Sequence, residues 1–541
     1  MSRIVHNNFL YPILAMIRTD RSNFTRYLIG FVTILVLGWG LTGLTNHASA
    51  QSTHLTSVNL GLGGGGAAYI DGYHSNFINP ANIGINRDVR PNFTLGLFWG
   101  LGMNAGGPLA NVGAYNKYMT KGLVLNEVAD QMYGEIFGGS PANFKSLGMN
   151  FNMVPIGMAY RRDDWAVSLS TRLRFMTDLS ANRGFFEFLT HGLDGDEFSE
   201  ATPASFNMKM LTMSEVSLGG SMHVLESNLG DFAFKGADVP VDVYAGIAPK
   251  LLIGHNSMGM NFNSNITVGD EQVIHDFNYG IRTVGEITNQ FNQYYVDHTQ
   301  RGMSDVSLGD YIEPEGGDFY KVKSFGMGLD LGATAEFDLS NVEALDIGSF
   351  FKGKKFARVA LSVTDIGQIN MSTDAGKFTH QGEFVWEGFE YDQERINAEF
   401  DSSFSNYTEH VTDSIANNVY LNYTPEEAGE ISNDLPTMFH LGTQFQMGRA
   451  GLMFDIARGF TKRGMTNKST TTALGLEYKT FGVWPLRVGI RTGGMGSTSY
   501  SFGTGIELRN FELSFSAMSV NDSSSNGYYI AGALSGLVFH F

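Results

Sequence analysis

The chain has 541 residues, a formal net charge of −18 at pH 7 and no cysteine. The acidic balance excludes nucleic-acid binding through the net field of the protein, and the missing cysteines exclude disulfides, thiolate metal sites and cysteine nucleophiles. The sequence holds 66 Gly, 41 Phe and 22 Tyr. This composition is unusual for a globular protein and typical of β-barrels, in which aromatic side chains face lipid and Gly relieves a crowded backbone.

The first 50 residues have the features of a secretory leader. Residues 27–44 form an uncharged apolar run preceded by three arginines, and Ala48-Ser49-Ala50 follows as a small-residue site. A basic flank, an apolar core and an A-x-A site are typical of a signal peptide, so we expect cleavage after Ala50. An uncleaved membrane anchor is the alternative, because the apolar run is long for a signal peptide.

Residues 51–90 precede the first predicted strand and contain the glycine-rich run GLGGGGA at positions 61–67. A nucleotide-binding loop is a poor interpretation, because the run lacks a Gly-Lys-Ser/Thr ending and no βαβ pattern surrounds it. Flexible or tightly packed backbone explains the glycines better. The sequence Asn79-Pro80-Ala81 follows shortly before the first strand.

The remainder of the chain alternates between apolar and polar residues. Phe325, Met327 and Leu329, for example, alternate with Gly326 and Gly328. Charged residues share a register with Gly and Ser, opposite an apolar register, as a wall with lipid outside and a lumen inside requires. No uncharged run after residue 50 approaches the roughly 20 residues of a membrane helix, so a membrane-spanning form must be a closed barrel. The fourteen predicted strands cover residues 91–102, 148–161, 165–176, 206–225, 240–254, 322–338, 355–366, 438–447, 450–461, 469–481, 486–494, 497–508, 510–520 and 527–541.

The lengths of the connections support a fourteen-stranded antiparallel transmembrane barrel over residues 91–541. If the first strand runs outward, the periplasmic connections are short or moderate and four extracellular loops are long, which is the expected asymmetry. The long extracellular loops are predicted at residues 103–147, 177–205, 255–321 and 367–437.

Two of these loops have further features. Residues 119–137 have a helix-like pattern and could pack over the mouth of the barrel. The loop at 367–437 is rich in Asp and Glu, and we interpret it as a solvated surface because it contains no D-x-D-x-D-G calcium loop. Bridging of divalent cations near lipopolysaccharide, or a charged lid, is the alternative.

The last predicted strand continues to Phe541, where an apolar register ends on an aromatic residue. The ends of soluble chains are usually frayed and polar, although a soluble protein whose last strand happens to end on Phe is the alternative. In the periplasm, an aromatic C-terminus resembles the signal read by the barrel-assembly machinery. We therefore predict that Phe541 is an assembly signal.

A motif near the start of the expected mature chain reads G-x-G-G-x-A-x…D…N-P-A. Its residues are Gly64, Ala67, Asp71, Asn79, Pro80 and Ala81. The motif resembles the start of FadL-type outer-membrane transporters and their PorV-like relatives, and residues 360–369, 475–478 and 485–489 also resemble this group. The closest likeness is to uncharacterised outer-membrane proteins of Bacteroidota-type bacteria.

This resemblance implies a monomeric fourteen-stranded barrel in which residues 51–90 form a hatch inside the lumen, with the motif Asn79-Pro80-Ala81 at its return towards the wall. In FadL-type barrels, hydrophobic molecules are captured outside and leave sideways through an opening in the wall.

Five arginines on the inward register are candidate substrate-binding residues, because each could meet a carboxylate: Arg172, Arg174, Arg358, Arg487 and Arg491. The alternative is that they pair with inward carboxylates, since buried charges are normally paired. The inward carboxylates considered are Asp330, Glu336, Glu507 and Glu512.

We predict passive uptake of hydrophobic, fatty-acid-like molecules across the bacterial outer membrane, without a cofactor or a metal. The alternative is a PorV-like barrel whose long loops bind a partner in protein secretion or surface attachment. An enzyme is not expected, because no G-x-S-x-G or H-E-x-x-H sequence occurs. The expected partners are outer-membrane lipid and lipopolysaccharide, the barrel-assembly machinery, and hydrophobic ligands or a secretion partner.

Overall fold

The computed structural model describes most of the chain beyond the predicted leader. The predicted signal peptide, residues 1–50, lies outside the described residues. The described ranges are residues 54–85, 91–118, 126–191, 198–228, 238–269, 272–303, 306–311, 320–342, 345, 353–387, 393–400, 403–415, 419, 421–466, 468–493, 498–519 and 528–541.

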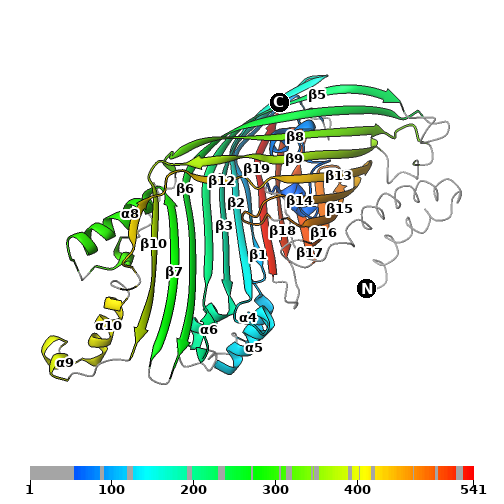
Figure 1. Cartoon of the computed structure of the whole chain (residues 1–541). Coiled ribbons are helices and arrows are strands. Elements are labelled where there is room, and N and C mark those ends of the chain that lie inside the picture. Colours follow the sequence, from blue (N-terminus) through cyan, green and yellow to red (C-terminus); the bar gives the residue numbers. More distant parts are fainter. Residues whose placement is uncertain are drawn as a thin grey trace.

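Fourteen antiparallel strands form a closed ring (Figure 1). The ring closes where the last strand pairs with the first, with Thr94 opposite His540 and Gly107 opposite Tyr528. In ring order the strands are β1 (Phe93–Gly107), β2 (Phe144–Arg161), β3 (Trp165–Asn182), β5 (Phe206–Asn228), β6 (Pro240–Val268), β8 (Ser324–Asp338), β9 (Lys355–Met371), β13 (Met438–Met447), β14 (Ala450–Gly459), β15 (Thr470–Thr480), β16 (Trp484–Gly493), β17 (Ser499–Glu507), β18 (Phe511–Ser519) and β19 (Tyr528–His540). Each corresponds to one predicted strand, so the predicted all-β fourteen-stranded barrel is confirmed.

The two ends of the ring differ in what they carry. One end holds the short turns and Phe541, whose N–H donates to the carbonyl of Phe93 at 2.9 Å. We call this the terminal end. The other end, which we call the loop end, carries the long connections.

Two of the ranges predicted as loops, 255–321 and 367–437, contain strands that enlarge the sheet at the loop end. β6 continues past β8 and pairs there with β7 (Val273–Val284), which pairs with β10 (Ala375–Trp386), which pairs with β11 (Thr424–Glu427). We call this part, with residues 256–268 of β6, the extension. β4 (Thr202–Pro203) pairs with β6, and β12 (Ile431–Asp434) pairs with β9.

Helices cover parts of the loop end. α4 (Val112–Tyr118), α5 (Asn126–Phe137) and α6 (Arg183–His191) gather below β1–β3 in Figure 1 and share a hydrophobic cluster. The predicted helix at 119–137 is found from Asn126 onward, and residues 119–125 lie outside the described part. α8 (Glu286–Tyr295), the π-helix η4 (Val296–Gln300) and the 3-10 helix η5 (Leu308–Asp310) adjoin the extension, and α9 (Gln393–Glu399) and α10 (Phe404–Ile415) follow β10. Among the described residues, no helix has the length and hydropathy needed to cross a membrane.

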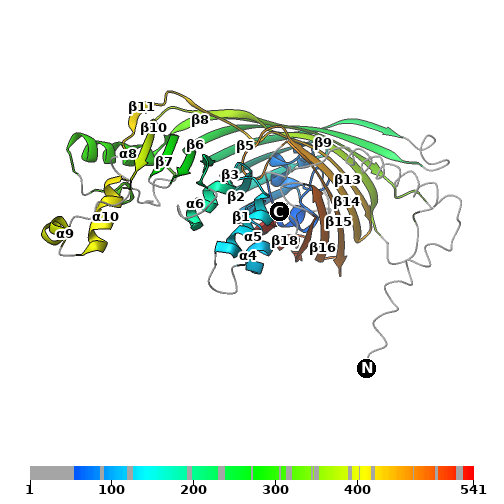
Figure 2. The same cartoon turned by 60° about the horizontal axis from the view of Figure 1, so that its bottom comes forward.

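Residues 54–85, which we call the inner segment, lie inside the ring (Figure 2). The segment contains α3 (Ser57–Gly61) and the 3-10 helices η1 (Gly72–Phe77) and η2 (Pro80–Ile83). Leu60, Leu62, Ala67 and Ile78 have no exposed surface. The chain therefore fills its own barrel with a short, mostly irregular segment.

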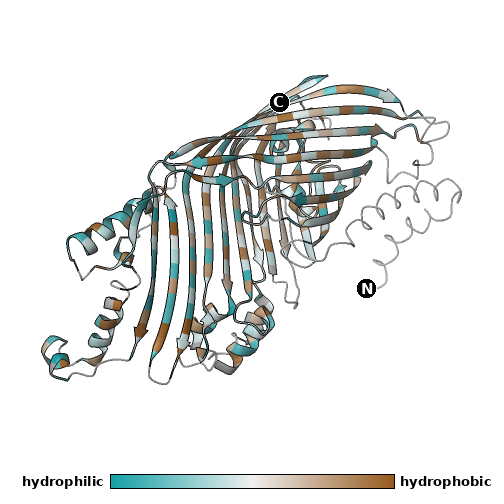
Figure 3. Cartoon of the chain, in the orientation of Figure 1, coloured by the Kyte–Doolittle hydropathy of each residue, from teal (hydrophilic) through white to brown (hydrophobic). Residues whose placement is uncertain are grey.

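The wall is apolar outside and polar inside, as the alternation of colours along its strands shows in Figure 3. On β3, Val167 and Leu169 face outward and are exposed, while Ser168, Ser170 and Arg172 face inward and are buried. A sheet that buries its polar register and exposes its apolar one is suited to lipid rather than to water.

Candidate functional site in the barrel interior

Glycines in the wall make room for the inner segment. A Cβ atom at Gly246 on β6 would clash with the backbone of Pro80 and Ala81, and a Cβ at Gly332 on β8 would clash with the amide of Asn79. Similar clashes with the inner segment would arise at Gly96, Gly102, Gly157, Gly219, Gly442, Gly475 and Gly489. Part of the high glycine content thus follows from close backbone approach between wall and inner segment.

The motif Asn79-Pro80-Ala81 anchors the end of the inner segment to the wall. The Asn79 side-chain amide donates to the Ala67 carbonyl and to Thr334 Oγ1 on β8, both at 2.8 Å. Its oxygen accepts from Ala81 N at 3.2 Å, and Pro80 begins η2. These three residues are buried against β6 and β8.

The glycine-rich run wraps around a wall carboxylate. Asp455 Oδ1 on β14 accepts from Gly66 N at 3.0 Å and from Ala67 N at 3.2 Å. Gly63, Gly64 and Gly66 have φ angles of +97°, +91° and +137°, which residues with a side chain rarely adopt. The run is therefore tightly packed backbone, which was one of the two predicted interpretations.

A buried cluster of three cations and three carboxylates lies on the inner face of β3, β5, β6, β8 and β9. Arg172 contacts Glu215 at 2.6 Å and Asp365 at 3.1 Å, and Arg174 contacts the same two carboxylates at 2.8 and 3.1 Å. Lys250 contacts Asp330 at 2.7 Å and Asp365 at 2.5 Å. The six side chains are at most 2% exposed. Each charge has partners of opposite sign, as charges removed from water require.

The inner segment rests on this cluster through an aromatic ring. The Arg172 guanidinium lies 4.1 Å and the Lys250 ammonium 5.6 Å from the centre of the Phe77 ring. Cation–π contacts of desolvated groups contribute about 2 kcal/mol. Phe77 is therefore an anchor of η1 as well as a packing residue.

Two further predicted arginines form ion pairs elsewhere on the wall. Arg487 contacts Glu477 at 2.7 Å and also pairs with Glu507. Arg358 contacts Glu336 at 2.6 Å. Four of the five candidate arginines therefore have carboxylate partners within the wall.

Arg491 differs from the other four arginines. It is 4% exposed, yet it has no carboxylate partner in the described part of the chain, where its Nε and Nη1 also make no hydrogen bond. Its guanidinium lies 4.1 Å from the centre of the Tyr529 ring. A buried cation normally has a counter-charge, so this position is the best placed to receive an anionic group.

Of the four carboxylates proposed as partners, two meet a candidate arginine. Glu336 pairs with Arg358, and Glu507 pairs with Arg487. Asp330 pairs with Lys250, while Glu512 contacts His540 at 2.8 Å.

Sequence reasoning missed Glu215, Lys250 and Asp365 as members of the buried cluster. Glu215 and Lys250 lie in predicted strands, on the register shared with Gly and Ser, so their inward direction could have been read from the alternation. Asp365 has a φ of +55° at an irregular stretch of β9, where alternation gives no guide to direction.

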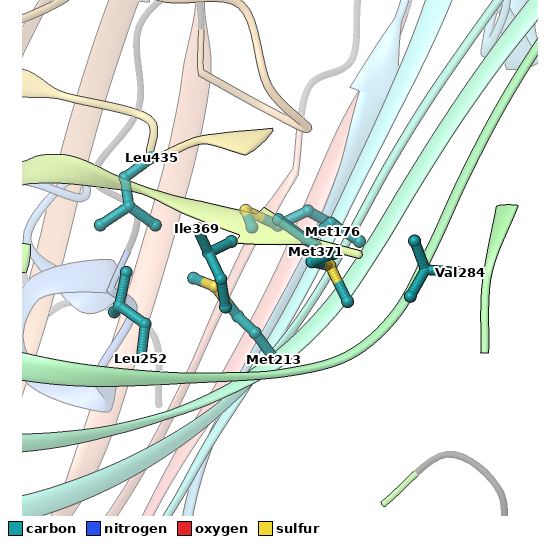
Figure 4. Packing of buried hydrophobic residues seen from close by; sticks show 8 residues of the cluster. Met176, Met213, Leu252, Val284, Ile369, Met371 and Leu435 are labelled. Atoms are coloured by element: carbon teal, nitrogen blue, oxygen red, sulfur yellow. The ribbon is translucent and has the colours of Figure 1, made fainter. Parts of the chain in front are cut away.

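On the side of the charged cluster that faces the loop end, the interior has an apolar layer. Met176 lies two residues beyond Arg174 on β3, and Leu252 lies two residues beyond Lys250 on β6, so the same inward registers change from charged to apolar. Figure 4 shows that the labelled residues of this first cluster come from several strands and point toward one another. The cluster consists of Met176, Leu211, Met213, Leu252, Val284, Ile369, Met371 and Leu435.

A second apolar cluster adjoins Arg491. It joins the inner segment to β18 and β19 and to the β14–β15 connection, and it includes Tyr529, the residue that stacks on Arg491. Its members are Leu55, Leu60, Met465, Met518, Tyr529, Ala531 and Ala533. The members of this cluster are at most 7% exposed, so it is a packed apolar layer beside a buried cation.

A small cavity of about 50 Å³ lies near the terminal end between the inner segment and β1, β2, β18 and β19. Polar side chains such as His74, Arg161 and His540 line it together with Tyr73. His74 Nδ1 lies 3.0 Å from His54 Nε2, and burial lowers the pKa of His74 to about 4. This region is more polar than the clusters at the loop end. In the described part of the chain, no group of three His, Cys, Asp or Glu side chains could hold a metal ion.

These features define a closed antiparallel β-barrel of the outer-membrane type, filled by its own N-terminal segment. Residues 93–519 match the family of unknown function DUF5723, and the chain belongs to that family. No curated protein matches the chain in sequence.

Several solved structures of outer-membrane channels are similar to the chain. The Ralstonia pickettii toluene transporter TbuX is 10% identical with a TM-score of 0.39, and the comparison covers 91% of this chain and 99% of that one. The Pseudomonas putida toluene transporter TodX is 12% identical with a TM-score of 0.36, covering 92% and 99%. A Pseudomonas aeruginosa FadL homologue is 10% identical with a TM-score of 0.39, covering 91% and 98%. At these identities and TM-scores the similarities carry no statement about substrate, and the resemblance to FadL-type barrels stays a prediction.

Proposed function

We propose that this protein mediates passive uptake of hydrophobic small molecules across the bacterial outer membrane. The observation that carries the proposal is the apolar interior at the loop end, formed by the clusters around Leu252 and around Tyr529. A water-filled pore for polar solutes is lined by polar side chains and does not require apolar clusters. An apolar solute, in contrast, is stabilised by about 0.8 kcal/mol for each CH₂ group that it buries.

The proposed orientation places the loop end outside the cell and the terminal end in the periplasm. The inner segment is then the predicted hatch, and it blocks a straight path through the ring. Phe541 lies in the periplasm in this arrangement, as an assembly signal requires.

Within this class we propose that the solute carries a carboxylate, as a fatty acid does. Arg491 is the proposed head-group site, because Arg172, Arg174, Arg358 and Arg487 already have carboxylate partners. The chain of the solute would lie along the cluster that contains Tyr529 and Met518. A bidentate contact between guanidinium and carboxylate would satisfy the buried cation.

Binding of dodecanoate to the purified barrel tests this proposal, with dodecanol as the uncharged match. We expect Arg491→Gln to weaken dodecanoate binding about tenfold or more and to change dodecanol binding little, because a hydrogen bond to a charged group is worth about 1.5–3 kcal/mol. Arg458→Gln, at an exposed arginine on β14, is the control. Equal binding of both solutes by all three proteins would refute the head-group site, and no binding of either would refute uptake.

A secretion-related role is the second candidate, and the extension favours it. Asp276, Asn278 and Arg282 on β7 present an exposed polar face that passage of an apolar solute does not need. Capture of a partner by the full chain, lost on substitution of these three residues by Ala while dodecanoate binding persists, would support this role.

A further inference from the structure

The connection between β14 and β15 crosses the ring to the opposite wall. We call residues 460–466 of this connection the strap. In ring order, six strands separate β14 from β2 in either direction, so the two strands face each other across the lumen. The strap nevertheless contacts β2 and β3, which means that it spans the loop end of the barrel above the inner segment.

Two polar side chains of the opposite wall hold the strap. Gly464 N donates to Asp178 Oδ2 on β3 at 2.7 Å, and Met465 N donates to Asn150 Oδ1 on β2 at 3.2 Å. A Cβ atom at Gly148 on β2 would clash with the Gly464 carbonyl, so the backbones approach closely. The strap turns at this point, because Arg463 and Thr466 pair as a β-bridge and Gly464 has a φ of +55°.

One apolar side chain connects the strap to the site below it. Met465 is 2% exposed and belongs to the cluster that contains Leu55 and Leu60 of the inner segment. Tyr529, which stacks on Arg491, is in the same cluster. The strap therefore covers the surface that is proposed to receive the solute.

We propose that the strap is a lid over the site at Arg491 and that Asp178 and Asn150 are its latch. Opening breaks the two hydrogen bonds to the opposite wall and uncovers one methionine, while every ladder hydrogen bond of the ring remains in place. The bonds from Thr461 to the Leu435 carbonyl at 3.2 Å and from Arg463 to Asn433 Oδ1 at 3.1 Å tie the strap to the near wall. The charge-assisted hydrogen bond to the Asp178 carboxylate favours one closed position of the strap, and because it is a single non-covalent bond it can break reversibly. The proposal that the strap controls access of a solute rests on the proposed uptake. The proposal that Asp178 and Asn150 hold the strap closed does not depend on it.

The latch is tested without any solute, using the chain's lack of cysteine. Leu60→Cys places a single thiol below the strap, at a position with no exposed surface. A water-soluble maleimide is added to the purified full chain, and the rate of labelling is measured. We expect Asp178→Ala or Asn150→Ala to raise this rate, by about tenfold for the charged partner, because the lost bond shifts the population towards the open lid.

Asp276→Ala is the matched control, since it removes an exposed carboxylate of the extension that the strap does not contact. Circular dichroism verifies that each variant retains its β-structure. Labelling at the control rate in both latch variants overturns the proposal, and labelling raised in both variants but not in the control supports it.

A covalent link that holds the strap closed tests the lid from the opposite side, by preventing opening instead of favouring it. Cysteines at Asn150 and Met465 are joined by a disulfide or a short bis-maleimide, and dodecanoate binding is measured before and after joining. We expect binding to slow at least tenfold in the locked chain, and unchanged binding kinetics would overturn the lid. A pair at Asn263 and Asn278, neighbours on β6 and β7 in the extension, is the control. If the proposed uptake is wrong, dodecanoate fails to bind to the unlocked chain, while the labelling result stands by itself.

Discussion

β6 belongs to two regions of the molecule that handle the same apolar register in opposite ways. In the ring, its outward residues Ile247 and Leu251 are 49% and 44% exposed. In the extension, its outward residues Met258, Met260 and Phe262 pack in an aromatic cluster with α8. In the ring, outward apolar side chains are exposed because lipid can cover them. In the extension, where lipid cannot reach, other parts of the chain cover them instead. The cover supplied by the chain itself therefore begins on β6 between Leu251 and Met258.

The inward faces of the ring and of the extension also differ in what covers them. In the ring the inward face is closed by the inner segment, and charges such as those of Arg172 and Lys250 are buried in ion pairs. In the extension the corresponding face carries exposed residues such as Asp276 and Asn278, and water solvates them. A change in one region should therefore leave the other intact, and the following substitutions test that separation.

Glu215→Ala is expected to have the largest effect, because it leaves Arg172 and Arg174 with a single shared carboxylate in a buried site. Breaking a buried ion pair costs about 3–5 kcal/mol. Thermal unfolding of the ring should shift markedly to lower temperature, while hydrogen exchange in β7 and β10 stays unchanged. Asp276→Ala in the extension is the control, and a similar loss of stability there would contradict the separation.

Phe291→Ala should disturb the extension and spare the ring. Phe291 on α8 is 3% exposed and stacks on Phe378 of β10 at 4.9 Å between ring centres. Truncation of a buried Phe costs about 3–5 kcal/mol, and here the loss is local. Hydrogen exchange should rise in α8, β7 and β10 only. Phe404→Ala, at a 48% exposed position, should change little.

Gly246→Ala tests the fit of the inner segment within a single strand. The added methyl would clash with Pro80 and Ala81, and overpacking costs about 1–3 kcal/mol. Protease cleavage within residues 54–85 should accelerate. Gly259→Ala is a matched control on β6, because nothing lies within 4 Å of its Cβ position in the extension. Equal protease resistance of the two variants would show that the glycine is not needed for the fit.

The smallest expected effect concerns Asp297 beside α8. Hydrogen bonds from Gln293 at 2.9 Å and Tyr311 at 3.0 Å, with the Arg301 charge, lower the pKa of this carboxyl below its ordinary value. The ionised Asp297 carboxylate stabilises the folded state at pH values above its pKa in the unfolded chain. This stabilisation disappears as the pH falls through the lower pKa that Asp297 has in the folded chain. A ¹³C NMR titration should show this low pKa, and Gln293→Ala should raise it. The ring has no part in this equilibrium, so its unfolding should not respond.

The alternation of residues predicted the ring well, because each strand has one face towards lipid and the other towards the lumen. The same rule could have found β7, whose residues His275, Phe277 and Tyr279 alternate with Asp276 and Asn278. The extension was missed because residues 255–321 and 367–437 were predicted as loops between the strands of the ring. Asp365 could not be predicted from alternation, because its positive φ falls at a break in the β8–β9 register.

The sequence by itself determined the fourteen strands of the ring, which of their registers faces inward, and that five arginines lie on that register: Arg172, Arg174, Arg358, Arg487 and Arg491. Only the tertiary structure decided that four of them are paired, whereas Arg491 has no carboxylate partner in the described part of the chain, and that a strap from β14 reaches Asp178 on the far wall. The reason is physical: facing is set by side-chain alternation within one strand, whereas pairing depends on how ring closure aligns strands far apart in the chain.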